Sequence, residues 1–190
     1  MKKIRRSVPV AVLSILLFAP ACRQKEPASP ATESGSPATH AYRVGETITF
    51  NEKGNAAAYK TGAWSYPEAW GTWSAGEEFG LQLEIDQPAD SDLVLSSVVG
   101  AFVNEKQREL SAQVLVNGER IDEWRFVYAQ NKEPYENRKI TIPKAIFNKA
   151  RPSVILFRLS KATSPAELGL GGDPRKLGLG FIRAQLDRPQ

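Results

Sequence analysis

The fold is predicted by a stretch of fifteen residues, Gln113–Val127, which reads QVLVNGERIDEWRFV. Apolar residues flank Asn117-Gly118 on both sides, and in the second half Trp124 alternates with Ile121 and Phe126. Asn-Gly is a strong hairpin signal because both residues tolerate the positive φ angles of a type I′ turn. The stretch therefore predicts a β-hairpin in which Trp124 packs in the core or against a sheet face.

Further strand patterns follow on both sides of this hairpin. The predicted strands cover residues 79–85, 93–103, 139–142, 154–159 and 178–186. Two short helical pieces are expected, over 143–147 and, after Ser164 as a cap, over 165–168. Many short strands with turn signals between them predict an all-β domain over residues 42–190, a jelly roll or β-sandwich of the carbohydrate-binding-module type.

The N-terminus has the pattern of a targeting signal over residues 1–21. Four basic residues precede an apolar run over 8–18, which is too short to span a bilayer as a mature helix. Small residues then lead into Cys22, and this resembles the lipobox of bacterial lipoproteins, in which the cysteine is acylated. An ordinary cleaved signal followed by an accidental cysteine is the alternative. We expect a lipid anchor at Cys22 in a bacterial envelope, and Arg23 after it favours the outer membrane of a Gram-negative cell.

Residues 22–41 are rich in Pro, Ser, Ala and Thr, and we expect them to form a disordered tether. The signal holds four basic and no acidic residues, so the mature chain would carry 21 basic and 21 acidic residues. No basic stripe indicates nucleic-acid binding. One cysteine and one histidine, His40 in the tether, argue against disulfides, His-based triads and multi-histidine zinc sites. Asp90 and Asp92 form no recognisable metal loop, so we expect no metal and no cofactor.

Two segments carry most of the polar and aromatic chemistry. Residues 64–74, WSYPEAWGTWS, contain three of the four tryptophans, and residues 167–180, ELGLGGDPRKLGLG, are rich in glycine. Indole faces and bidentate carboxylate or arginine groups are the usual elements of a sugar site. The candidate ligand-binding residues are Trp64, Glu68, Trp70, Trp73, Asp173 and Arg175.

Each candidate residue also has a structural interpretation. Trp64 is as compatible with the core as with a ligand, and Trp70 and Trp73 could cover the end of the sandwich. Glu68 could accept backbone N–H groups in the tryptophan loop. Asp173 and Arg175 could form a salt bridge that closes the last loop.

The tryptophan segment, together with AFV (101–103), VNG (116–118), SPAELG (164–169) and DPRKLGLG (173–180), resembles a family of bacterial β-sandwich modules. In that family the modules form the extracytoplasmic ends of membrane glycosyltransferases and phosphoglycerol transferases, or stand alone in the envelope. The resemblance covers residues 60–187 and implies a jelly roll associated with cell-surface glycan. It implies no reaction, because it assigns no functional residues, and we expect no transferase activity because this chain shows no transferase portion.

Three functions are therefore open. The first is a non-catalytic module that binds cell-surface or exported polysaccharide through the six candidates. The second is an interaction subunit whose tryptophan segment docks on a protein of an envelope glycan synthesis or export system. The third is a glycosidase that uses Glu68 and Asp173 as its pair of acids. A concave site favours a sugar, whereas a flat apolar patch favours a protein partner.

Overall fold

The structure is a computed structural model that describes residues 41–85 and 87–189. The signal peptide over 1–21, Cys22 and all but the last residue of the tether lie outside the described residues. The described chain is nearly all β, as expected. Its strands are β1 (Thr47–Thr49), β2 (Lys60–Pro67), β3 (Thr72–Leu83), β4 (Leu93–Ala101), β5 (Glu109–Val116), β6 (Glu119–Val127), β7 (Tyr135–Ile142), β8 (Ser153–Leu159) and β9 (Leu179–Asp187). A 3-10 turn, η1 (Ala56–Ala58), and a short helix, α1 (Lys144–Phe147), complete the elements.

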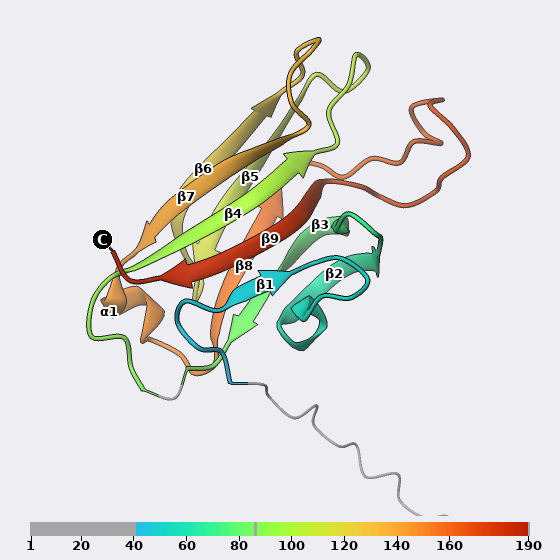
Figure 1. Cartoon of the computed structure of the whole chain (residues 1–190). Coiled ribbons are helices and arrows are strands. Elements are labelled where there is room, and N and C mark those ends of the chain that lie inside the picture. Colours follow the sequence, from blue (N-terminus) through green and yellow to red (C-terminus); the bar gives the residue numbers. More distant parts are fainter. Residues whose placement is uncertain (1–40, 86, 190) are drawn as a thin grey trace, which may run out of the picture. The chain divides into compact units, whose positions relative to one another are not determined.

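The strands form a sandwich whose two layers are joined through β3 (Figure 1). One layer has the order β6-β5-β8-β3, with β2 paired to β3, and the other has the order β9-β4-β7, with β1 paired to β9. The first residues of β3, Thr72 and Trp73, pair with β9, whereas residues 78–83 pair with β8. All of these pairs are antiparallel, as in the sandwich that the sequence predicted.

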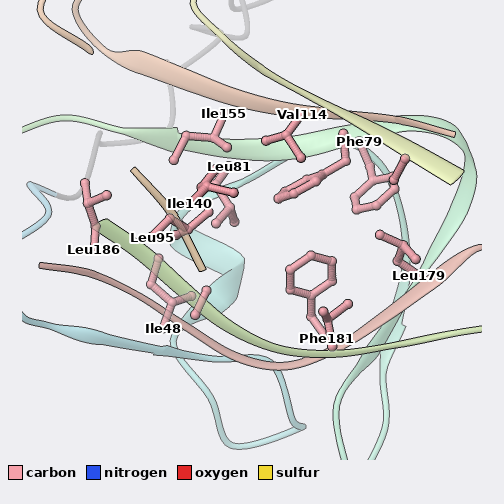
Figure 2. Close-up of a cluster of buried hydrophobic side chains, with 14 of the residues drawn as sticks. Ile48, Phe79, Leu81, Leu95, Val114, Ile140, Ile155, Leu179, Phe181 and Leu186 are labelled. Atoms are coloured by element: carbon pink, nitrogen blue, oxygen red, sulfur yellow. The ribbon is translucent and has the colours of Figure 1, made fainter. Parts of the chain in front are cut away.

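The core lies between the layers, where alternate residues of each strand face inward (Figure 2). Leu95 on β4 and Phe181 on β9 face Phe79 on β3 and Ile155 on β8, and all four are buried. Phe79, Phe157 and Phe181 contact one another through their rings, with centroids 5.2–6.1 Å apart. Trp124 is buried against Phe157, which confirms its predicted place in the core.

The predicted hairpin is present as β5 and β6, with the turn at Asn117 (φ 49°) and Gly118 (φ 86°). The Asn117 side chain also connects the turn to distant backbone. It donates to the carbonyls of Ile146 and Phe147 at 2.8 and 2.9 Å and accepts from the N–H of Val154 at 2.8 Å. The residue that suits the turn locally therefore also fixes the position of α1.

Two local predictions need correction. Residues 64–74 form parts of two strands rather than a loop, because Glu68 and Gly71 exchange backbone hydrogen bonds and close a tight turn between β2 and β3. The segment 165–168 forms hydrogen-bonded turns rather than a helix. Its predicted cap is nevertheless present, since the Ser164 hydroxyl accepts from the N–H of Glu167 and the Glu167 carboxylate accepts from the N–H of Ser164.

Within residues 41–85 and 87–189, no helix is long and apolar enough to cross a membrane.

Candidate functional site

Three aromatic side chains gather at one end of the β9-β4-β7 layer. Trp70 lies in the turn between β2 and β3, Trp73 is the second residue of β3, and Tyr135 is the first residue of β7. The ring centroids of Trp70 and Trp73 are 5.2 Å apart, and those of Trp70 and Tyr135 are 5.5 Å apart. All three side chains are half-buried. We refer to Trp70, Trp73 and Tyr135 as the aromatic cluster.

Two glycines make room for the aromatic cluster on the outer face of the sheet. Gly180 on β9 pairs with Gly100 on β4, and its neighbours Leu179 and Phe181 point into the core. A Cβ atom on Gly180 would lie 2.8 Å from Cη2 of Trp70 and 2.9 Å from Cε3 of Trp73. A Cβ atom on Gly100 would lie 2.9 Å from Cδ1 of Tyr135. The rings therefore rest directly on the sheet backbone.

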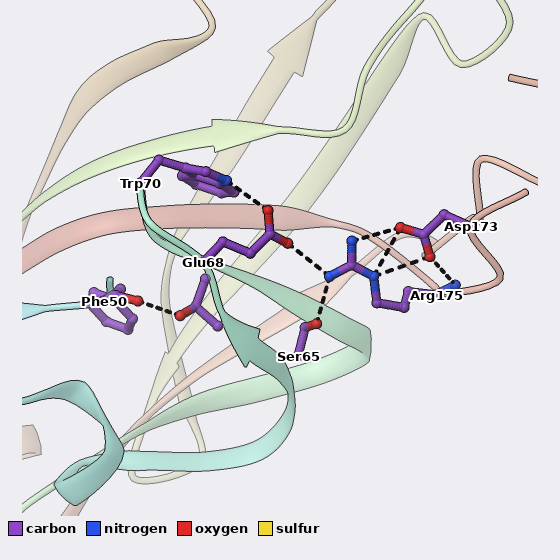
Figure 3. A network of polar contacts seen from close by, with 7 residues as sticks. Phe50, Ser65, Glu68, Trp70, Asp173 and Arg175 are labelled. Carbon is purple, nitrogen blue, oxygen red and sulfur yellow. Dashed lines mark hydrogen bonds and ion pairs between the residues drawn. The ribbon is translucent and has the colours of Figure 1, made fainter. Parts of the chain in front are cut away.

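A polar network fixes the edge of the aromatic cluster (Figure 3). The carboxylate of Glu68 accepts from the indole N–H of Trp70 at 2.9 Å and from Nη1 of Arg175 at 2.8 Å. Nη1 of Arg175 also donates to the Ser65 hydroxyl at 2.9 Å, and its Nε and Nη2 bind the Asp173 carboxylate at 2.9 and 2.6 Å. The network therefore holds the loop that contains Asp173 against the turn that contains Trp70.

The close charges and the burial in this region shift the pKa values of Asp173, Arg175 and Tyr135. The hydrogen bond from Arg175 holds the pKa of Asp173 below its ordinary value, and the bond to Asp173 raises the pKa of Arg175. Burial, followed by the charge of Glu68, raises the pKa of Tyr135. A glycosidase needs one carboxyl group that carries a proton at the working pH. The lowered pKa of Asp173 does not suit that role.

Five of the six predicted candidates meet in this region, and Trp64 does not. The Trp64 ring contacts Phe79 and Phe50 at centroid distances of 4.9 and 5.3 Å. Its indole N–H donates to the backbone carbonyls of Thr61 and Gly80, at 3.1 and 3.0 Å. The structure thus places Trp64 against the core, which is one of the two interpretations that the sequence left open. For Asp173 and Arg175, the salt-bridge geometry is present.

A cleft of about 230 Å³ opens beside the aromatic cluster. Trp73 and Tyr135 line it, together with residues just after β4, at the end of β6, in the β6–β7 loop and at the start of β7, among them Val103, Phe126, Tyr128, Lys132 and Glu136. Glu136 makes ion pairs with Lys132 and Arg138 at 3.1 and 2.5 Å, so the rim of the cleft is charged. Sequence reasoning missed Tyr135, because only the register of β7 against β4 places it opposite Gly100.

Among the described residues, no group of three or more His, Cys, Asp or Glu side chains is placed to hold a metal ion.

No protein-family model and no curated protein matches the sequence. Solved structures that match part of this chain include the insecticidal delta-endotoxin Cry8Ea1 of Bacillus thuringiensis, with 13% identity and a TM-score of 0.41 over 63% of this chain and 20% of that one. Two others come from Listeria monocytogenes. The protein lmo2446, in complex with glucose, magnesium and calcium, has 12% identity and a TM-score of 0.37. The cycloalternan-forming enzyme, in complex with a pentasaccharide substrate, has 12% identity and a TM-score of 0.36.

For both Listeria proteins the match covers 77% of this chain and 11% of theirs. This chain thus spans a fifth or less of the length of these three proteins.

Proposed function

We propose that this domain binds a saccharide at the aromatic cluster and catalyses no reaction. The observation that carries the proposal is the position of Trp70, Trp73 and Tyr135 on the outer face of a sheet, beside a cleft. Aromatic rings supply the apolar surface on which sugar rings pack, and Glu68 and Arg175 at the edge supply fixed hydrogen-bonding groups.

The setting of this binding follows from the N-terminal sequence. A signal over residues 1–21 that is followed directly by Cys22 supports a lipid anchor in a bacterial envelope, and residues 22–41 would separate the domain from the bilayer. Surface or exported polysaccharide is then the sugar within reach. The resemblance of residues 60–187 to modules associated with envelope glycan agrees with this assignment.

The test is a calorimetric titration of the full-length chain with a panel of bacterial surface polysaccharides. Trp70→Ala removes the one ring of the aromatic cluster that does not line the cleft. We expect this variant to bind saccharide at least about tenfold more weakly than the wild type, equivalent to about 1.4 kcal/mol. Tyr128→Ala is the matched control, because it removes an aromatic ring from the cleft alone. Equal losses in the two variants, or no saccharide bound by the wild type, would contradict the proposal.

A second function, docking to a protein of the glycan machinery, is favoured by Tyr66. This side chain is 63% exposed and lies over the Arg175 guanidinium at 4.6 Å. Exposed tyrosine and arginine are frequent anchors of protein interfaces. A photo-crosslinker at position 66 should then capture one envelope protein that the same crosslinker at exposed Arg158 does not capture. If both positions give the same products, this second function loses its support.

A further inference from the structure

The outer face of the β9-β4-β7 layer continues beyond the aromatic cluster as two rows that are polar except for Val98. The strand register places Arg183, Val98 and Asn137 side by side in the first row. Gln185, Ser96 and Lys139 form the second row. None of these six residues is buried, so their side chains face away from the core. We refer to the six as the sheet track.

The geometry of the sheet track suits an extended chain. Residues two apart on a strand are separated by about 7 Å. Along β4, the first row therefore lies about 7 Å from the aromatic cluster, and the second row lies about 7 Å further on. The second row also lines a groove of about 710 Å³, together with Val44, Val94, Asp187 and Arg188. A polymer with one sugar on the aromatic cluster would therefore have a concave surface for the sugars that follow.

The sheet track contains two charged residues, Arg183 and Lys139, and both are cationic. Arg183 and Lys139 make no hydrogen bond and no ion pair with their side chains to any other described residue. The one acidic side chain lining the groove, Asp187, accepts from Gln185 at 3.0 Å, and Arg188 pairs with Asp90 at 3.5 Å. By contrast, Arg158 on the other layer is paired with Glu78 at 2.5 Å. The sheet track thus presents two cations that have no partner within residues 41–85 and 87–189.

We propose that the sheet track binds an acidic polysaccharide, with Arg183 and Lys139 each holding an anionic group of successive sugars. The inference rests on the proposed saccharide binding at the aromatic cluster and specifies the class of the ligand. Charge complementarity supports it, because an unpaired guanidinium binds a carboxylate, sulfate or phosphate through two parallel hydrogen bonds, and an ammonium group adds a second point charge. Asn137 and Ser96 can bond sugar hydroxyls beside the two charges.

The test compares acidic polymers with their neutral counterparts on the full-length chain. The probes are polygalacturonate against its methyl ester and dextran sulfate against dextran. We expect at least one acidic probe to bind at least about tenfold more tightly than its neutral counterpart, with an affinity that falls as salt rises. Arg183→Ala and Lys139→Ala should each weaken acidic binding about tenfold, and Arg183→Lys should restore part of the loss.

Arg158→Ala is the matched control, because it removes the same charge from an exposed strand position on the other layer. If it weakens acidic binding as much as Arg183→Ala, the attraction is non-specific and the inference is wrong. If neutral probes bind as tightly as acidic ones and Trp70→Ala abolishes their binding, saccharide binding stands and the sheet track fails. If no probe and no surface polysaccharide binds, both proposals fail.

Discussion

Replacing Gly180 with alanine tests how the sheet displays its aromatic side chains. The new methyl group would point outward from β9, between the indoles of Trp70 and Trp73. Its carbon would lie 2.8 Å from Cη2 of Trp70, and 2.9 and 3.0 Å from Cε3 and Cζ3 of Trp73. These separations are well below the 3.5–4.0 Å at which two carbon atoms attract each other best. At least one indole must therefore move off the sheet.

The size of the effect follows from this overlap. Inserting a methyl group into a packed site costs about 1–3 kcal/mol. For a domain of about 150 residues, each kcal/mol lowers the melting temperature by about 2–4 °C. We therefore expect Gly180→Ala to lower the melting temperature by roughly 2–12 °C. Movement of Trp70 would also disturb its 2.9 Å bond to Glu68, so saccharide binding should weaken as well.

The assay is thermal unfolding followed by circular dichroism, with the near-ultraviolet spectrum as a report on indole packing. Gly172→Ala is the matched control, because a Cβ atom there would meet nothing within 4 Å. We expect the control to stay within about 0.5 kcal/mol of the wild type. An unchanged melting temperature and an unchanged near-ultraviolet spectrum in Gly180→Ala would refute the assigned packing.

Three further predictions concern charged and buried groups. Arg175→Lys should lower the free energy of unfolding by about 1–3 kcal/mol in urea titrations, because lysine cannot reproduce the two parallel hydrogen bonds to Asp173. An unchanged urea midpoint would contradict a stabilising role for the polar network around Arg175. Because Arg175 lowers the folded-state pKa of Asp173, the pair stabilises the fold above the unfolded-state pKa of about 4, and this contribution is lost as the pH falls through the folded-state value. Unfolding of Asp173→Asn should accordingly depend less on pH below about pH 4, and a slope equal to that of the wild type would contradict this. Burial and a hydrogen bond to Glu46 raise the pKa of Tyr59 to about 12. The protonated Tyr59 side chain should therefore stabilise the fold fully below about pH 10, and this contribution should be lost as the pH rises through about 12. Absorbance at 295 nm should show one tyrosine fewer ionising near pH 10 in Tyr59→Phe if this pKa is ordinary, and no such change if it is raised.

The sequence predicted those parts of the fold that depend on local chemistry. Asn117-Gly118 indicated a hairpin because both residues accept positive φ angles, and the structure has them at 49° and 86°. The predicted place of Trp124 in the core followed from its alternation with Phe126 on one strand. The predicted cap at Ser164 was similarly local, although the turns after it do not continue into a helix.

The candidate site depends on contacts that the sequence pattern does not contain. Trp64 and Trp73 lie on paired strands, but register shifts on both sides of Trp64 determine which way its ring points. Arg175 meets Glu68 across 107 residues of chain, and Tyr135 joins Trp70 only because β3, β9, β4 and β7 are neighbours. Gly100 and Gly180 provide the space for the rings, but their place beneath the aromatic cluster becomes evident only once β4 and β9 are paired.

Contact of Trp70 and Trp73 with a saccharide can be observed through the indole N–H resonances of the four tryptophans. Two-dimensional NMR spectra of the 15N-labelled full-length chain would be recorded during titration with a bound polysaccharide fragment. We expect the Trp70 and Trp73 resonances to shift with ligand concentration, whereas those of Trp64 and Trp124, which pack against the core, should not move. Shifts confined to Trp64 or Trp124, or no indole shift at saturating ligand, would contradict it.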